Sequence, residues 1–180
     1  MSQPEVWLRG AIPSISPLLQ PVAHSLLQCR EELASTVTGL PPEQLWARPG
    51  GAASIGFHAR HAAGSLDRLF TYARGNKLSP DQHAVLAAEG QPDAASGADL
   101  RLVAAFNLAV EHALEQLRTT NESTLLDARG VGRRELPSTV IGLLFHAAEH
   151  TQRHVGQLVT TARILAGERP APGQHSGASG

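Results

Sequence analysis

The sequence predicts an all-α protein, built as a four-helix bundle with one long crossover connection. In four blocks of roughly 20 residues, apolar side chains recur at steps of three, four and seven, the spacing of helices that bury one face. Segments rich in Gly and Pro separate the blocks, and no run of alternating apolar and polar residues is long enough to predict a strand. Four helices of this length suit a bundle.

The first two blocks have recognisable ends. The first covers about residues 18–38, and Pro21 can occupy its first turn. Gly39 and the stretch PPEQLWARPGG end it. Ser54 can cap the second block, which ends at Gly75. The apolar face of the first block is formed by Leu19, Val22, Leu26, Leu33 and Val37.

A long polar connection separates the second and third blocks. It covers about residues 76–96, and a short helical turn is expected around residues 82–89. The third block follows at residues 99–119, and the fourth covers about residues 138–166. Between these two, the stretch GVGRRELPS contains Gly and Pro and is interpreted as a loop. The long connection is the predicted crossover.

Length and composition suit a single helical domain over residues 1–166, followed by a flexible tail over residues 167–180 that is rich in Pro, Gly and Ser. A formal net charge of -1 lacks the basic excess of a nucleic-acid-binding surface. No signal peptide is recognisable, and no apolar run approaches the roughly 18 residues of a membrane span. The single cysteine, Cys29, excludes an internal disulfide. We therefore expect a cytoplasmic protein without nucleic-acid or membrane partners.

Three histidines stand out in the fourth block. The stretch LLFHAAEHTQRHVGQL places His146, His150 and His154 at steps of four in a helix with an apolar face. Helical geometry puts His150 and His154 near the middle of the apolar stripe and His146 toward its edge. Two imidazoles four residues apart can bind one ion. The alternative is a hydrogen-bonded core network, which is the commoner role of a single buried histidine.

A third metal ligand would have to come from another helix. The second block offers His58 and His61 in the stretch SIGFHARHAAG. Periodicity slightly favours His58, because His61 is turned further from the apolar side. However, the small residues 62–65 would let another helix approach His61 closely. The residues alone therefore leave both histidines open. A ferritin-like di-iron site is not expected, because no glutamate is followed by a histidine three residues later.

The stretches LWARPGGAASIGFHARHAAGSLDRL and LLFHAAEHTQRHVGQL resemble the DinB-like superfamily of four-helix-bundle metalloproteins. The histidine pair ahead of VGQL resembles the HxxxH segment of that family, and the histidine that begins HAAGSLDR resembles its upstream histidine. The resemblance extends over nearly the whole chain up to the tail. It implies that His61, His150 and His154 are three metal ligands in a bundle of the DinB-like type.

The same resemblance places the other two histidines of these stretches, His58 and His146, beside the site. His146 and His58 would be free to act on a metal-bound water or on a substrate, which makes both of them candidate catalytic residues. Glu149 is a third candidate, because it adjoins His150 and could orient an imidazole, although it could equally be an exposed helix charge.

Coordination chemistry indicates what such a triad can do. Three neutral imidazoles bind a divalent ion such as Zn²⁺, Ni²⁺ or Fe²⁺ and leave at least one position open for water or a thiol. No protein cysteine lies near the predicted triad, so a thiolate nucleophile would come from a low-molecular-weight thiol. We therefore expect a metal-dependent S-transferase that acts on a small-molecule substrate. The alternatives are a metal-dependent hydrolase and a non-catalytic, metal-stabilised binding protein related to stress.

A homodimer is also expected. The stretch PPEQLWARP lies beside an apolar bundle face that could support self-association, and proteins of the family that this chain resembles are often dimeric.

Overall fold

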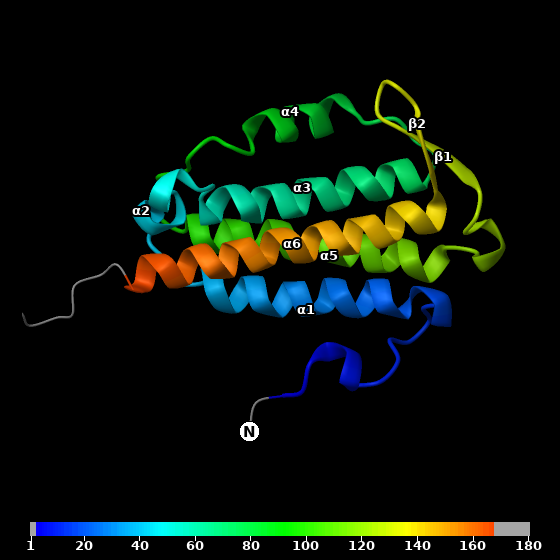
Figure 1. The fold of residues 1–180 in the computed structure, drawn as a ribbon, viewed down its shortest axis with the longest axis horizontal. Helices are drawn as coiled ribbons and strands as arrows, with labels where there is room; N and C mark the ends of the chain where they lie inside the picture. Colours follow the sequence, from blue (N-terminus) through cyan, green and yellow to red (C-terminus); the bar gives the residue numbers. More distant parts are fainter. Residues whose placement is uncertain (1–2, 168–180) are drawn as a thin grey trace, which may run out of the picture.

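Four long helices dominate the structure. In the computed structural model, which describes residues 3–167, they are α1 (Gln20–Val37), α3 (Ile55–Ala73), α5 (Ala98–Thr119) and α6 (Val140–Gly167). Helix α3 packs against α5 and α6, and α1 packs against the same two helices (Figure 1). They correspond to the four predicted blocks, so the mostly helical fold was predicted correctly.

The connection between α3 and α5 runs along the outside of α3. Both helices point in the same direction, so the chain has to travel back between them (Figure 1). The return path contains α4 (Pro80–Ala88), which contacts α3. The Ser79 hydroxyl accepts a hydrogen bond from the Gln82 amide at 3.1 Å, and the Gln82 side chain accepts one from the Ser79 amide at 2.9 Å. This reciprocal cap explains why the helix begins at Pro80, ahead of the expected residues 82–89.

Short elements complete the helical part of the chain. The stretch between α1 and α3 contains α2 (Pro42–Leu45). The hydroxyl of Ser54 accepts a hydrogen bond from the Phe57 amide at 3.2 Å, so Ser54 caps α3 as its sequence position predicts. Four single turns of 3₁₀-helix lie at Val6–Leu8, Pro17–Leu19, Pro49–Gly51 and Glu122–Thr124.

The prediction of an all-α protein is wrong in one segment. Strands β1 (Ala128–Val131) and β2 (Leu136–Thr139) form an antiparallel hairpin where the sequence predicts only a loop. The turn uses positive φ angles of 68° at Gly132 and 49° at Glu135. Each strand has four residues, too few to show a clear alternation, and Pro137 within β2 is typical of a loop or an edge strand.

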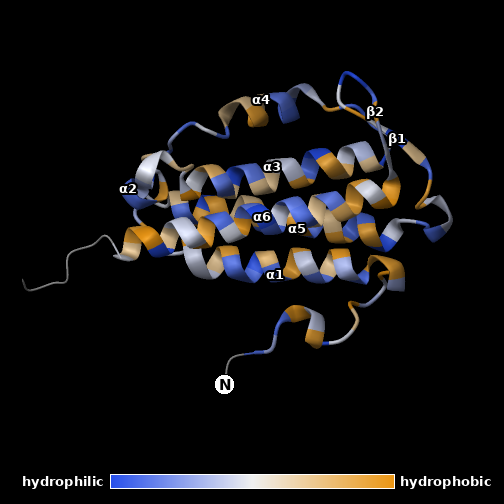
Figure 2. Ribbon diagram, viewed as in Figure 1, coloured by the Kyte–Doolittle hydropathy of each residue, from blue (hydrophilic) through white to orange (hydrophobic). Residues whose placement is uncertain are grey.

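The hydrophobic core draws side chains from all four long helices. Hydrophobic and hydrophilic residues alternate around these helices, as expected when each helix buries one face (Figure 2). Cys29 belongs to this core and is fully buried. Burial raises the pKa of the Cys29 thiol to about 12, so the thiol stays protonated near neutral pH. The largest fully buried core residues include Leu19, Leu26, Leu33, Leu66, Phe106, Leu117, Leu144 and Leu158.

Two further expectations concern membrane-spanning helices and the C-terminal tail. None of the helices within residues 3–167 is both long enough and apolar enough to cross a membrane. Helix α6 includes Gly167, the first residue of the predicted tail. The rest of that tail, residues 168–180, lies outside the described residues.

Candidate metal centre

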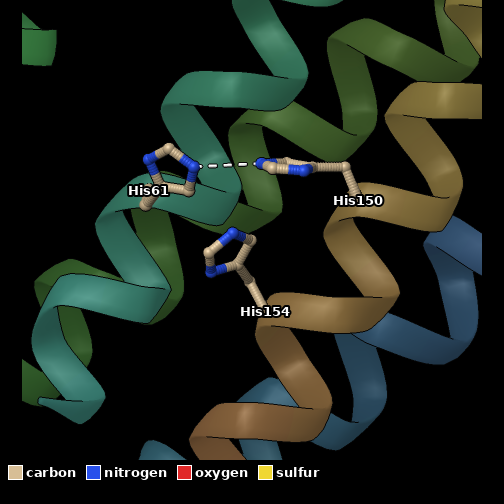
Figure 3. Close-up of side chains that lie close together, drawn as sticks. All are labelled: His61, His150 and His154. Atoms are coloured by element: carbon tan, nitrogen blue, oxygen red, sulfur yellow. Dashed lines mark hydrogen bonds between the residues drawn. The ribbon is translucent and has the colours of Figure 1, made fainter. Parts of the chain in front are cut away.

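Helices α3 and α6 bring three of the predicted histidines together. His61 comes from α3, and His150 and His154 come from consecutive turns of α6 (Figure 3). Each of the three side chains offers one potential ligand atom, and these atoms all lie within 4.8 Å of one another. The three residues are half-buried, so the cluster lies where the packed helices meet solvent.

The spacing of the rings is close to what a shared ion requires. The Nε2 atoms of His61 and His150 are 3.0 Å apart. Two nitrogen ligands of one tetrahedral ion, each at roughly 2.0 to 2.2 Å, are separated by about 3.4 Å. The ring centre of His154 is 4.4 Å from that of His61 and 4.6 Å from that of His150. Small side-chain adjustments would therefore bring the three imidazoles around a single ion.

The buried stripe of α6 is centred differently from the prediction. Its middle is formed by Ala147, Thr151, Val155 and Leu158, each with none of its surface exposed. His150 and His154 lie on the side of this stripe that faces α3, rather than at its centre. The stripe shifts because α6 packs against both α1 and α3. The polar Thr151 is accommodated by donating its hydroxyl hydrogen bond to the carbonyl of Ala147 at 2.7 Å.

The structure places both histidines of α3 near the cluster. His58 is buried, with 6% of its surface exposed, and its Nδ1 lies 3.0 Å from Nδ1 of His154. His61 is less buried but belongs to the three-histidine group. Periodicity correctly indicated that His58 is the more buried residue, whereas the family resemblance pointed to His61, which lies within the potential ligand set.

His146 and Glu149 lie outside this group. Nδ1 of His146 is 3.3 Å from a carboxylate oxygen of Glu149, and the two side chains are 51% and 40% exposed. Glu149 also pairs with Arg153 on the next turn of α6. The carboxylate of Glu149 therefore pairs with two residues of its own helix, and within residues 3–167 it forms no hydrogen bond with the His150 imidazole that it could have oriented.

Sequence reasoning missed Glu89, the residue that follows α4. Glu89 is only 3% exposed, and its Oε2 lies 2.7 Å from Nδ1 of His61. Its other oxygen accepts a hydrogen bond from Nη1 of Arg68 at 2.7 Å. Burial raises the pKa of this carboxyl, but hydrogen bonds from His61 and Arg68 outweigh that effect and lower the pKa. The sequence contains no spacing signal for this contact, because Glu89 is 28 positions from His61.

One of the small residues near His61, Gly64, makes room for a charged pair. A Cβ atom at Gly64 would lie 2.5 Å from Oε1 of Glu89 and 2.7 Å from Nη1 of Arg68. Gly64 therefore makes room for this buried ion pair. On the neighbouring turn, the ring of Phe57 stacks on the ring of His61, with centres 5.5 Å apart and planes inclined by 12°.

The electrostatics keep several of these imidazoles neutral. Burial, followed by the neighbouring imidazoles of His61, His150 and His58 and by the charge of Arg153, lowers the pKa of His154 to about 4. Burial also lowers the pKa values of His58 and His150, again with a contribution from His61. A neutral imidazole has the free lone pair that a metal ion requires.

An open groove of about 610 Å³ lies directly beside the cluster. His58 and Arg153 line it together with residues at the start of α3 and in the second half of α6, namely Ala52, Ala53, Gly156, Gln157, Thr160, Thr161 and Ile164. A separate cavity of about 400 Å³ lies between the end of α3 and the hairpin, and its lining includes Tyr72, Lys77 and Arg133. The first of these hollows is lined by His58, which contacts His154, although His61, His150 and His154 do not line it themselves.

Comparison with known proteins identifies the family. The chain resembles the crystal structure of a conserved protein from Enterococcus faecalis, with a TM-score of 0.66 and 19% sequence identity, over 83% of this chain and 98% of that one. At this identity the likeness concerns the fold alone. Comparison with curated proteins gives no match. The sequence profile of the DinB superfamily matches residues 25–158, which span most of α1, all of α3 and α5, and the part of α6 that carries its three histidines. The chain therefore belongs to the DinB superfamily.

Proposed function

We propose that the protein binds one divalent metal ion through His61, His150 and His154, with Zn²⁺, Ni²⁺ and Fe²⁺ as the candidate ions. The observation that carries this proposal is the convergence of three imidazoles from two helices within 4.8 Å of one another. We further propose that the four long helices form a bundle of the DinB-like type, and that residues 1–166 act as one domain that holds these side chains in place. The shared hydrophobic core supports that view.

The donor set fits such an ion. Imidazole nitrogen is a good ligand for zinc, nickel and iron. His150 and His154 have lowered pKa values, so their lone pairs are available at neutral pH. Among the described residues, Nδ1 of His150 is buried without a hydrogen-bond partner, so the protein does not use all of the hydrogen-bonding capacity of this ring. Three protein donors leave at least one coordination position for a small molecule.

We propose that the activity is a metal-dependent S-transfer that uses a low-molecular-weight thiol. When bound, the ion would supply a Lewis acid with an open position for that thiol. Cys29 cannot replace the external thiol, because it is fully buried and the pKa of its thiol is about 12. The groove beside the cluster would hold the electrophilic small-molecule substrate.

Among the three candidate catalytic residues, we favour His58. It lines the groove, hydrogen bonds with His154, and its lowered pKa leaves it neutral and able to accept a proton. His146 and Glu149 pair with each other on the exposed surface of α6 instead. The position of His58 also supports the alternative of a metal-dependent hydrolase, in which the same imidazole would accept a proton from water.

We retain a homodimer as part of the proposal, but its interface would not use the segment that suggested it. Leu45 is fully buried, and the ring of Trp46 covers Gly56, where an added Cβ would come within 2.7 Å of the ring. Large exposed apolar side chains lie elsewhere, including Leu108 on α5 and Phe145 on α6. Light scattering of the purified protein at several concentrations tests this proposal, and a monomer at all of them contradicts it.

The decisive experiment measures metal before activity. The protein is purified without chelator and without nickel affinity, and its bound metal is quantified by elemental analysis. We expect about one ion per chain in the wild type and loss of that ion in the His61→Ala, His150→Ala and His154→Ala variants. His83→Ala, which removes an exposed histidine of α4, is the matched control and retains the ion. A wild type that binds no divalent ion contradicts the proposal.

Turnover is then tested with the metal-loaded protein. Several low-molecular-weight thiols are combined with several small electrophiles, and the His58→Gln variant is assayed beside the wild type. Thiol-dependent turnover that decreases in this variant supports the S-transferase. Turnover without any thiol supports the hydrolase, and metal binding without turnover supports a non-catalytic role.

A further inference from the structure

A buried ion pair links the crossover connection to the candidate metal centre. Glu89 belongs to the connection between α3 and α5, yet it is 3% exposed and lies against α3. Its carboxylate contacts His61 through Oε2 and Arg68 through Oε1, each at 2.7 Å. Burying a carboxylate is costly unless it is paired and hydrogen-bonded, so this arrangement has to be well formed to persist.

The carboxylate determines which nitrogen of His61 carries a proton. Oε1 of Glu89 accepts from the Arg68 guanidinium at 2.7 Å, and a carboxylate paired with a guanidinium has no proton to donate and can only accept. Nδ1 of His61 must therefore donate, and the neutral ring then has its free lone pair on Nε2. That atom is the one that lies 3.0 Å from Nε2 of His150, on the side of the ring that faces the cluster.

The surrounding residues make this contact specific. Arg68 is 8% exposed and approaches Glu89 from the same helix that carries His61. Gly64 lies between them, and a Cβ atom there would come too close to both charged groups, at 2.5 Å and 2.7 Å. On α3, His61 and Arg68 thus bind the Glu89 carboxylate, and Gly64 leaves space for it.

We propose that Glu89 is a positioning residue of the metal centre, which holds His61 with Nε2 free for the ion and thereby couples metal binding to the docking of residues 89–91 on α3. This inference rests on the proposed function, because it assumes that His61 is a ligand. An ordered acceptor behind a ligating imidazole typically improves metal affinity by 10- to 100-fold. By linkage, the ion must favour the contact between Glu89 and His61 by the same factor.

The connection has other anchors, which provide a control. Nη1 of Arg60 donates to the carbonyls of Ala88, at 3.2 Å, and Gln91, and the Trp46 indole donates to the carbonyl of Asp93 at 2.9 Å. None of these contacts involves His61. The Arg60→Met variant therefore loosens the connection while leaving the pair of Glu89 and His61 in place.

The test combines calorimetric zinc titration of the metal-stripped protein with nitrogen NMR of the His61 ring. In the wild type without metal we expect the tautomer with the proton on Nδ1. In Glu89→Gln we expect zinc affinity to fall by about 10- to 100-fold, whereas in Arg60→Met it changes by less than about threefold. Gly64→Ala keeps every ionisable group but displaces Glu89, so it should lower the affinity in the same direction and serves if Glu89→Gln does not fold.

Hydrogen exchange provides a readout that is independent of affinity. Zinc should slow amide exchange at residues 89–91 in the wild type, and this protection should be lost in Glu89→Gln. Wild-type zinc affinity in a folded Glu89→Gln variant, or a proton on Nε2 of His61 in the wild type, overturns the inference. Equal losses in Glu89→Gln and Arg60→Met also overturn it, because they would assign the effect to docking alone. If the wild type binds no divalent ion at all, the proposed function itself fails.

Discussion

At the scale of single residues, His154 is the imidazole whose surroundings most strongly oppose a proton. Burial contributes most, and the neighbouring imidazoles of His61, His150 and His58 and the charge of Arg153 add to its effect. The pKa of His154 is consequently about 4 in the folded protein, compared with about 6.5 for an unfolded histidine. The same features that favour metal binding make the ion-free protein sensitive to acid.

The first prediction follows from the sign of this shift. Between about pH 6.5 and pH 4 the unfolded chain binds more protons at this position than the folded protein, so acidification favours unfolding. The stability gained from a neutral His154 is complete above about pH 6.5 and is lost as the pH falls toward about 4. Denaturant titrations of metal-stripped protein from pH 7.5 to 4.5 should show this decrease, and His154→Gln should show a shallower one. Equal slopes in both proteins contradict the prediction.

The second prediction separates the first two histidines of the HxxxHxxxH run in α6, His146 and His150. His146 is 51% exposed and pairs with Glu149, whereas His150 belongs to the group of potential ligands. Replacing His150 by Ala should abolish metal binding, while His146→Ala should retain most of the metal, as elemental analysis and zinc titration can determine. Comparable metal loss in both variants would mean that His146 is also a ligand.

At the scale of secondary-structure elements, close packing at one glycine fixes how α3 begins. The indole of Trp46 lies directly over Gly56. The guanidinium of Arg60 lies over the same indole, 4.7 Å from the ring centre. Trp46 in turn donates to the Asp93 carbonyl of the crossover connection. A single indole thus joins α2, α3 and the connection near the histidine cluster.

The third prediction compares two glycines in helices. A Cβ atom at Gly56 would come within 2.7 Å of the Trp46 ring, so Gly56→Ala should destabilise the protein by about 1 to 3 kcal/mol. Gly156 in α6 has open space around its Cα, so Gly156→Ala should stabilise the helix by up to about 1 kcal/mol. Thermal and denaturant unfolding measure both effects. A neutral Gly56→Ala variant would show that the indole can move aside without cost.

The elements also show what the sequence can and cannot reveal. The four long helices and the Ser54 cap were predictable, because periodicity and capping residues are local signals. The hairpin was not, because four-residue strands that contain Gly and Pro look like a loop. The steps of four between His146, His150 and His154 indicated the cluster, but the histidine from α3 required the family resemblance. The role of Glu89 could not be predicted, because its partner His61 lies 28 positions away and the crossover connection brings the two together.

At the scale of the whole molecule, the core and the candidate metal centre contribute separately to stability. The core includes fully buried side chains from all four long helices, whereas the histidines are half-buried at its edge. Removal of an ion bound at this edge would not disturb the side chains of the core. We therefore expect the metal to add to the stability of a protein that already folds.

The fourth prediction quantifies this contribution. Free metal at 100 times its dissociation constant stabilises the folded state by about 2.7 kcal/mol. For a chain of this size, that corresponds to a rise in Tm of roughly 5 to 10 °C. Calorimetry at pH 7.5, with and without chelator, measures the difference, and circular dichroism should still show a helical protein after metal removal. Complete unfolding on removal would indicate a structural metal instead of a catalytic one.

The separation of the clustered histidines along the chain has a consequence for biosynthesis. His61 and His150 are 89 positions apart, and His58 and His154 are 96 positions apart. At a synthesis rate of about 5 to 20 residues per second, His61 is synthesised roughly 4 to 18 seconds before His150. During that interval α3 exposes two histidines without the helix that should cover them. The nascent chain therefore offers metal ions only a weak, incomplete set of ligands until α6 has been synthesised.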